Sequence, residues 1–172
     1  MGDRASGAAM TGRVVHLELA RLEAAHLVGL VQQFAELVGD SAPTLADPAI
    51  ARLVPPAYDD RDAAQEFRDL TQADLLDRRS SDAAVVLESL AEAARISDDP
   101  DDPALLETVA VRLDPVQTQA WLRTLAAIRL VLAARLGVTE SESADAEDPR
   151  FGIYEWLGYR LDGLVAAVDG DD

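Results

Sequence analysis

Three arginines are the side chains most able to form ion pairs or bind a ligand in an otherwise apolar stretch of the chain. Arg123, Arg129 and Arg135 are spaced six residues apart, so on a helix they point about 120° away from one another. A buried guanidinium requires a carboxylate partner, and the chain contains 32 Asp and Glu residues. We therefore expect a buried ion-pair network around these three arginines. The alternative is that one of them marks a polar pocket.

Aromatic side chains form the second group of candidates, and they gather near the end of the chain. Phe151, Tyr154, Trp156 and Tyr159 lie within nine residues of one another. One helix face cannot bury four such rings. One alternative is that the rings pack mainly in the core, and the other is that some of them form an interface with a partner or a second copy of the chain. Both alternatives remain open from the sequence.

Motifs of catalysis and metal binding do not occur in the sequence. His16 and His26 are ten residues apart and do not have the spacing of metal ligands. The acidic segments at 98–102 and 140–148 lack the glycine and the terminal glutamate of a calcium-binding loop. We therefore expect no catalytic, cofactor-binding or metal-binding residues, and a protein that is not an enzyme.

The three arginines lie on a predicted helix whose two ends are both marked in the sequence. Asp114 suits the N-cap, Pro115 the first helical position, and Gln117 can complete a capping box. Gly137 can end the helix in the left-handed conformation. Between these ends, apolar residues cover most of the helix circumference. The pattern predicts a central buried helix.

Helical patterns also dominate the rest of the chain. We expect a helix at 20–38, a short helix that begins at Asp47, and a last helix from Asp148 to about Val168. Between them, residues 60–95 favour two or three consecutive helices, because Ser80 and Ser81 could cap a new one.

Two short runs rich in valine and leucine, at 13–19 and 108–113, have the pattern of strands, and each is the other's only available partner. The expected fold is thus mainly α: a helical bundle around a central buried helix, with a small two-stranded β-sheet. We expect one domain over residues 12–168, a disordered tail at 1–11 and a disordered acidic tail at 169–172.

Composition narrows the set of partners. The net charge of −17 disfavours direct binding of nucleic acid, and the absence of cysteine excludes thiol sensing, disulfides and thiolate catalysis. The first residues contain no apolar run of the kind that directs export, and the predicted central helix is too short and too often interrupted by arginine to span a membrane. We expect a cytoplasmic protein.

Four segments carry a resemblance to a known family. WLRTLAAIRLVLAARLGV at 121–138 and DPRFGIYEWLGYRLDGLV at 148–165, with DPAIARLVPPAY and EFRDLTQADL in the first half, resemble an actinobacterial family labelled AosR-like oxidative-stress transcriptional regulators. Its genes often lie beside that of the proteolysis adaptor ClpS. The resemblance implies regulation linked to redox state, acting with a sigma factor or RNA polymerase.

Together these observations favour a regulatory protein that acts through protein–protein contacts. The transcription machinery is the partner that the resemblance implies, and an accessory role in ClpS-linked Clp proteolysis is the alternative. A cofactor is not expected, and the last helix is the expected contact surface.

Overall fold

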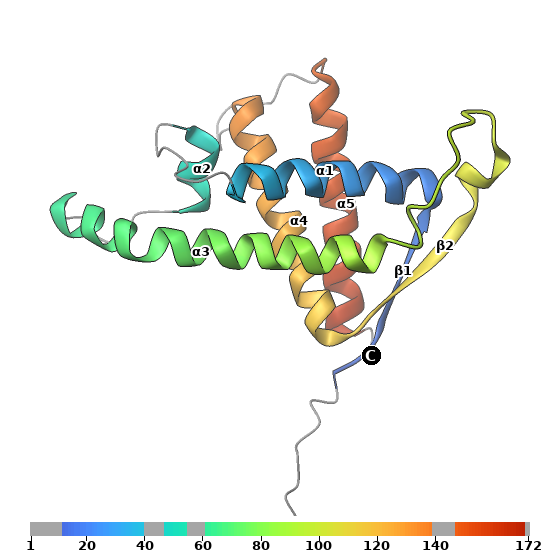
Figure 1. Ribbon diagram of the computed structural model, residues 1–172, viewed down its shortest axis with the longest axis horizontal. Helices are drawn as coiled ribbons and strands as arrows, with labels where there is room; N and C mark the ends of the chain where they lie inside the picture. The colour runs from blue at the N-terminus through green and yellow to red at the C-terminus, as the bar shows by residue number, and fades with distance from the viewer. Residues whose placement is uncertain (1–11, 40–46, 55–60, 139–146, 171–172) are drawn as a thin grey trace, which may run out of the picture.

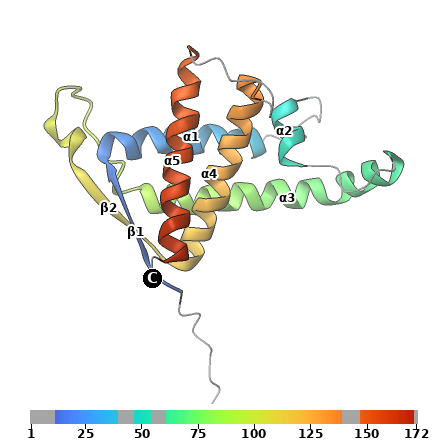
Figure 2. The ribbon, with the colours of Figure 1, turned by 180° about the vertical axis from the view of Figure 1, so that it is seen from behind.

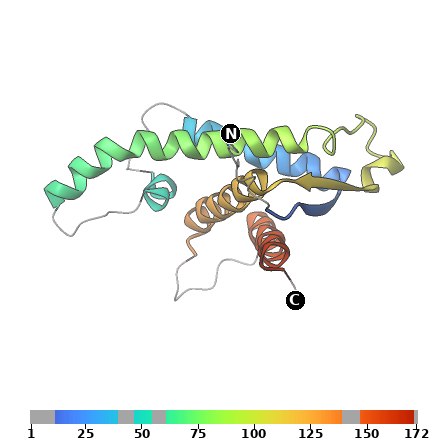
Figure 3. The same cartoon turned by 90° about the horizontal axis from the view of Figure 1, so that it is seen from below.

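The protein consists of two layers of paired helices. The computed structural model describes residues 12–39, 47–54, 61–138 and 147–170, with the backbone alone for 61–70. Helix α1 (Arg21–Gly39) lies antiparallel beside α3 (Arg61–Leu90), and α4 (Pro115–Leu136) lies antiparallel beside α5 (Pro149–Asp169) (Figures 1 and 3). The short helix α2 (Pro48–Leu53) packs on α4. The expected mainly α fold with a small sheet is confirmed.

The two predicted strands pair with each other. Strand β1 (Val15–Ala20) runs antiparallel to β2 (Thr108–Leu113). Because β1 leads directly into α1 and β2 leads into α4, the sheet joins the two helical layers. Side chains of both strands enter the core: Val15, Leu19, Val111 and Leu113.

Helix α4 lies at the centre and contacts α1, α2, α3, α5 and β2. Both of its predicted ends are confirmed: Asp114 and Gln117 form a reciprocal capping box, and Gly137 ends the helix at φ +66°. Its Trp121 is 1% exposed and donates to Ser89 Oγ of α3 at 2.8 Å. The helix is not buried all round, however, because Val116 is 71% exposed.

One predicted boundary is wrong. Residues 61–90 form the single helix α3, where we expected two or three helices. Ser81 does not cap a new helix but donates its hydroxyl to the carbonyl of Asp77, four residues earlier. A serine inside a helix can satisfy its hydroxyl in this way without ending the helix. The packing of α3 along α1 and α4 keeps the helix continuous.

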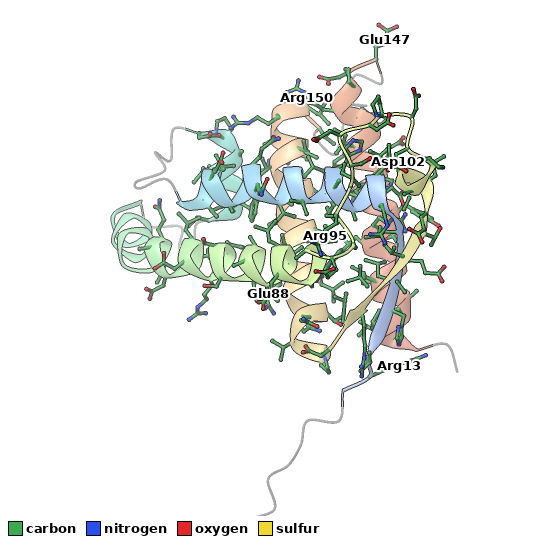
Figure 4. All side chains as sticks on the ribbon, turned by 45° about the vertical axis from the view of Figure 1, so that its right-hand side comes forward. Arg13, Glu88, Arg95, Asp102, Glu147 and Arg150 are labelled. Atoms are coloured by element: carbon green, nitrogen blue, oxygen red, sulfur yellow. The ribbon has the colours of Figure 1, made fainter. Side chains whose placement is uncertain are left out.

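The end of the chain also differs slightly from expectation. Helix α5 continues through Asp169, one residue beyond the expected end near Val168, and Gly170 follows it at φ +66°. Arg13 lies at the end of the molecule where α5 ends, whereas Glu147 and Arg150 lie at the opposite end (Figure 4). Of the predicted tails at 1–11 and 169–172, residues 1–11 and 171–172 lie outside the described residues.

Candidate functional site

Helix α5 carries the candidate aromatic residues and presents them on two opposite faces. Asp148 caps the helix by accepting from the amide of Arg150 at 2.9 Å. Residues four apart lie on one side of a helix. Tyr154 and Gly158 therefore share the side that faces α4, and Trp156 and Arg160 share the side that faces α1 and β1. Figure 2 shows α5 with α4 on one side and β1 on the other.

On the α1 side, Glu23, Trp156 and Arg160 form what we name the closed cluster. Arg160 Nη2 donates to both carboxylate oxygens of Glu23, at 2.7 and 2.8 Å. The same carboxylate accepts from Trp156 Nε1 at 3.1 Å and from the amide of Ala20 at 2.9 Å. Arg160 Nη1 also donates to the carbonyl of Glu18. The cluster thus fixes α5 to the junction of β1 and α1, although within the described structure the buried Nε of Arg160 lacks a partner.

The closed cluster keeps Glu23 ionised. Desolvation raises the pKa of Glu23, but the hydrogen bonds from Ala20, Arg160 and Trp156 outweigh it, so the pKa lies below its ordinary value. A carboxylate with this low pKa is a poor proton donor or acceptor near neutral pH. The arrangement is therefore suited to holding elements together.

On the α4 side, Arg129, Tyr154 and Gly158 form what we name the open cluster. Arg129 Cζ lies 4.3 Å from the centroid of the Tyr154 ring, and its Nε donates to the Tyr154 carbonyl at 3.4 Å. A Cβ on Gly158 would lie 3.1 Å from Nη2 of Arg129. Among the described residues, no carboxylate pairs with Arg129, and its Nη groups have no hydrogen-bond partner.

The three arginines of α4 thus do not form the predicted buried network. Arg123 pairs with Asp82 of α3 at 2.7 Å, and Arg135 pairs with Asp47 at 2.8 Å, but their side chains are 50% and 41% exposed. The hydrogen bonds that Arg123 donates to the Asp82 carboxylate raise the pKa of Arg123. The 120° spacing directs the arginines to different neighbours, and their length carries the guanidinium groups to the surface.

The four candidate interface residues do not share one exposed face. Phe151 stacks on Tyr154 with ring centroids 6.2 Å apart, and both are half-buried, as is Trp156 in the closed cluster. Tyr159 is 72% exposed. Packing therefore accounts for most of the aromatic surface, and Tyr159 is the ring that remains open to solvent.

A groove separates α1 from the first half of α5. Its volume is about 810 Å³, and apolar surface predominates in its walls. The closed cluster lies at one end, where Glu23 and Trp156 contribute to the lining. The rest of the walls is made largely of small and aliphatic residues: Ala25, Gly29 and Leu30 of α1, and Pro149, Gly152 and Ile153 of α5. We name this feature the α1–α5 groove.

His16 and His26 lie exposed on different elements, β1 and α1. Within the described ranges, no group of three or more His, Asp or Glu residues could hold a metal ion. The helices seen in those ranges are also too short or too polar to cross a membrane.

Comparison with known proteins places the chain in a family. A family model described as a domain of unknown function, DUF2017, matches residues 5–168. The chain belongs to the DUF2017 family. No curated protein and no solved structure matches it.

In this DUF2017 chain, sequence reasoning overlooked Glu23, Arg160 and Gly158. Two weak signals were available, because Arg160 follows Trp156 by four residues and Gly158 follows Tyr154 by four, so each pair shares a helix face. Glu23 gave no such signal, since it is separated from Arg160 by 137 positions. Only the packing of α5 beside the β1–α1 junction brings them together.

Proposed function

We propose that this protein is a non-catalytic regulator and that it binds an amphipathic helix of a partner protein in the α1–α5 groove. The observation that carries the proposal is the glycine on each wall. Gly29 and Gly152 both lie within helices, and a Cβ at either position would meet nothing within 4 Å. Glycine inside a helix costs about 1 kcal/mol relative to alanine. This destabilisation brings no closer packing within the fold. The absent side chains instead let a helix that docks in the groove approach both walls more closely.

The charge near the groove favours a basic partner. Glu36 lies one helical turn beyond Gln33 of the groove wall, and Glu155 lies one turn beyond Gly152. Both carboxylates are on exposed residues, and the chain has a net charge of −17. A helix with an apolar stripe flanked by Arg or Lys matches this surface, and the same charge opposes direct binding of nucleic acid.

The identity of the partner is drawn from the sequence resemblance. This resemblance favours a sigma factor or an RNA polymerase subunit as the partner, in cytoplasmic regulation linked to oxidative stress. Because the chain has no cysteine, the oxidative signal would reach it through the partner. The alternative partner is the ClpS-linked Clp machinery, and a second copy of the chain is a further outcome of the test.

The test is affinity capture of the tagged protein from its own cells, with Gly29→Leu compared to Gly163→Leu. Both changes place leucine within a helix where, apart from the helix's own neighbouring backbone, no atom lies within 4 Å of the new Cβ, and both should raise the melting temperature. Only Gly29 lies in the groove, since Gly163 is on an exposed part of α5.

We expect a sigma factor or RNA polymerase subunit to be recovered with the wild type and with Gly163→Leu, but lost with Gly29→Leu. The same pattern for Clp components would support the alternative instead. If Gly29→Leu captures the same proteins as the wild type, the groove is not the binding surface. A gel mobility shift with sequence-specific DNA binding would contradict the protein-contact mechanism.

A further inference from the structure

Arg129 differs from the other two arginines of α4 in having no acidic partner among the described residues. Arg123 and Arg135 each pair with an aspartate, in a chain with 32 acidic and 15 basic residues. A half-buried guanidinium in so acidic a protein would ordinarily be paired. The position instead provides an aromatic ring and a glycine, which support the cation without neutralising it.

The open cluster holds the guanidinium in a fixed place. The Tyr154 ring lies 4.3 Å from Arg129 Cζ, and the carbonyl of the same residue accepts from Nε. On α5, Gly158 leaves room for the guanidinium, because a Cβ there would come within 3.1–3.2 Å of three of its atoms. The Nη groups donate no hydrogen bond to any residue that the structure describes, so their hydrogens are available to a ligand. This positioning reduces the side-chain entropy that a ligand would otherwise have to overcome.

An apolar pocket adjoins the cation. Its volume is about 290 Å³, and Arg129 and Tyr154 line it together with Ala126, Leu130, Ala133 and Leu161. Leu130 is 42% exposed, so the pocket opens to solvent beside the guanidinium. At this size it suits one small apolar group and not a drug-sized molecule.

We propose that Arg129 binds a carboxylate whose neighbouring apolar group enters this pocket. The planar guanidinium donates two parallel hydrogen bonds to a carboxylate, and the aliphatic lining takes up the group beside it. Phosphate suits the site less well, because one cation must balance a dianion within a protein of charge −17. Two sources share the proposed chemistry: the C-terminal residue of another chain and a free aliphatic acid.

The site is separate from the α1–α5 groove. The pocket lies between α4 and α5, whereas the groove lies between α1 and α5. Loss of one therefore does not require loss of the other, and the proposal stands or falls without the helix-binding function above.

The first experiment is an NMR titration of the full chain with N-acetyl-leucine and with its uncharged analogue N-acetyl-leucinamide. We expect the acid to shift the Arg129 Nε–H and Gly158 amide signals with a Kd on the order of 1 mM, as is typical of so small a ligand. The amide should bind at least tenfold more weakly. Equal shifts from both compounds, no shift at these signals, or tighter binding of inorganic phosphate would overturn the proposal.

Variants locate the site. Arg129→Gln should abolish the shift at Gly158, whereas Arg123→Gln, which removes the same charge from the same helix, should leave it unchanged. Unaltered binding by a folded Arg129→Gln variant would disprove the assignment. To distinguish the two sources, octanoate is compared with an acetylated tripeptide ending in leucine: tighter binding of the peptide identifies a chain terminus, and tighter binding of octanoate identifies a free acid.

Discussion

The two arginine–aromatic clusters of α5 contain similar side chains in different electrostatic situations. In the closed cluster Arg160 lies near Trp156 and is neutralised by Glu23. In the open cluster Arg129 lies over Tyr154 and has no acidic partner within the described ranges. A cation that is paired with a carboxylate stabilises contacts between elements, whereas a positioned cation without a carboxylate partner can bind a ligand. The difference assigns a structural role to one face of α5 and a binding role to the other.

The largest expected effect is that of Glu23→Ala in the closed cluster. The change removes the acceptor of three donors: the Arg160 guanidinium, the Trp156 indole and the Ala20 amide. The Glu23 side chain is 35% exposed, so solvent weakens these interactions. We therefore expect the free energy of unfolding to fall by about 2 kcal/mol, which corresponds to a decrease of about 4–8 °C in melting temperature. Thermal unfolding measures it, with Arg129→Gln as the control, expected to lose no more than about 1 kcal/mol because only a cation–π contact and one long hydrogen bond are removed. Equal losses for both variants would remove the distinction between the clusters.

An intermediate effect is expected from pH. The folded-state pKa of Glu23 is lowered, so its contribution is fully present above the ordinary pKa of about 4.3 and is lost as pH falls through the lower folded value. Urea unfolding should therefore show the wild type about 1 kcal/mol more stable than Glu23→Gln near pH 7, with the difference shrinking below the ordinary pKa and disappearing once the pH is below the lowered folded-state pKa. A difference that persists in acid would show that the charge of Glu23 is not what stabilises the cluster.

The smallest expected effect on stability is that of Gly158→Ala in the open cluster. Alanine improves helix propensity by about 1 kcal/mol, but its Cβ displaces the guanidinium and weakens a cation–π contact worth about 0.5–1 kcal/mol. The free energy of unfolding should thus stay within about 0.5 kcal/mol of the wild-type value, while the affinity for N-acetyl-leucine falls at least tenfold in the NMR titration. Full binding by this variant would mean that Gly158 does not position Arg129.

The ends of the helices were predictable because they depend on neighbours in sequence. Asp47, Asp114 and Asp148 each cap the helix that follows, and a proline occupies the next position in every case. Capping requires only a side chain within reach of amides two or three residues away. Tertiary contacts can override weaker local signals, as at Ser81, where the packing of α3 maintains a continuous helix.

The candidate sites were predictable only in part. The sequence indicated Arg129 and Tyr154, but as members of an ion-pair network and of an aromatic interface, respectively. Their contact depends on α4 and α5 lying side by side, and so does the role of Gly158, which only the position of the guanidinium explains. Helix periodicity gives the direction of a side chain on its own helix but not the residue that it meets on another.

By itself, the sequence determined the helical class, the three capped helix starts, the paired strands and an acidic chain without thiol chemistry. These properties follow from composition and from interactions between residues close together in the chain. The tertiary structure alone decided that Arg160 is paired with a carboxylate, that Arg129 has no acidic partner among the described residues, and that a groove lies between α1 and α5. Those outcomes depend on how two layers of helices pack, and that packing joins residues as far apart as Glu23 and Arg160.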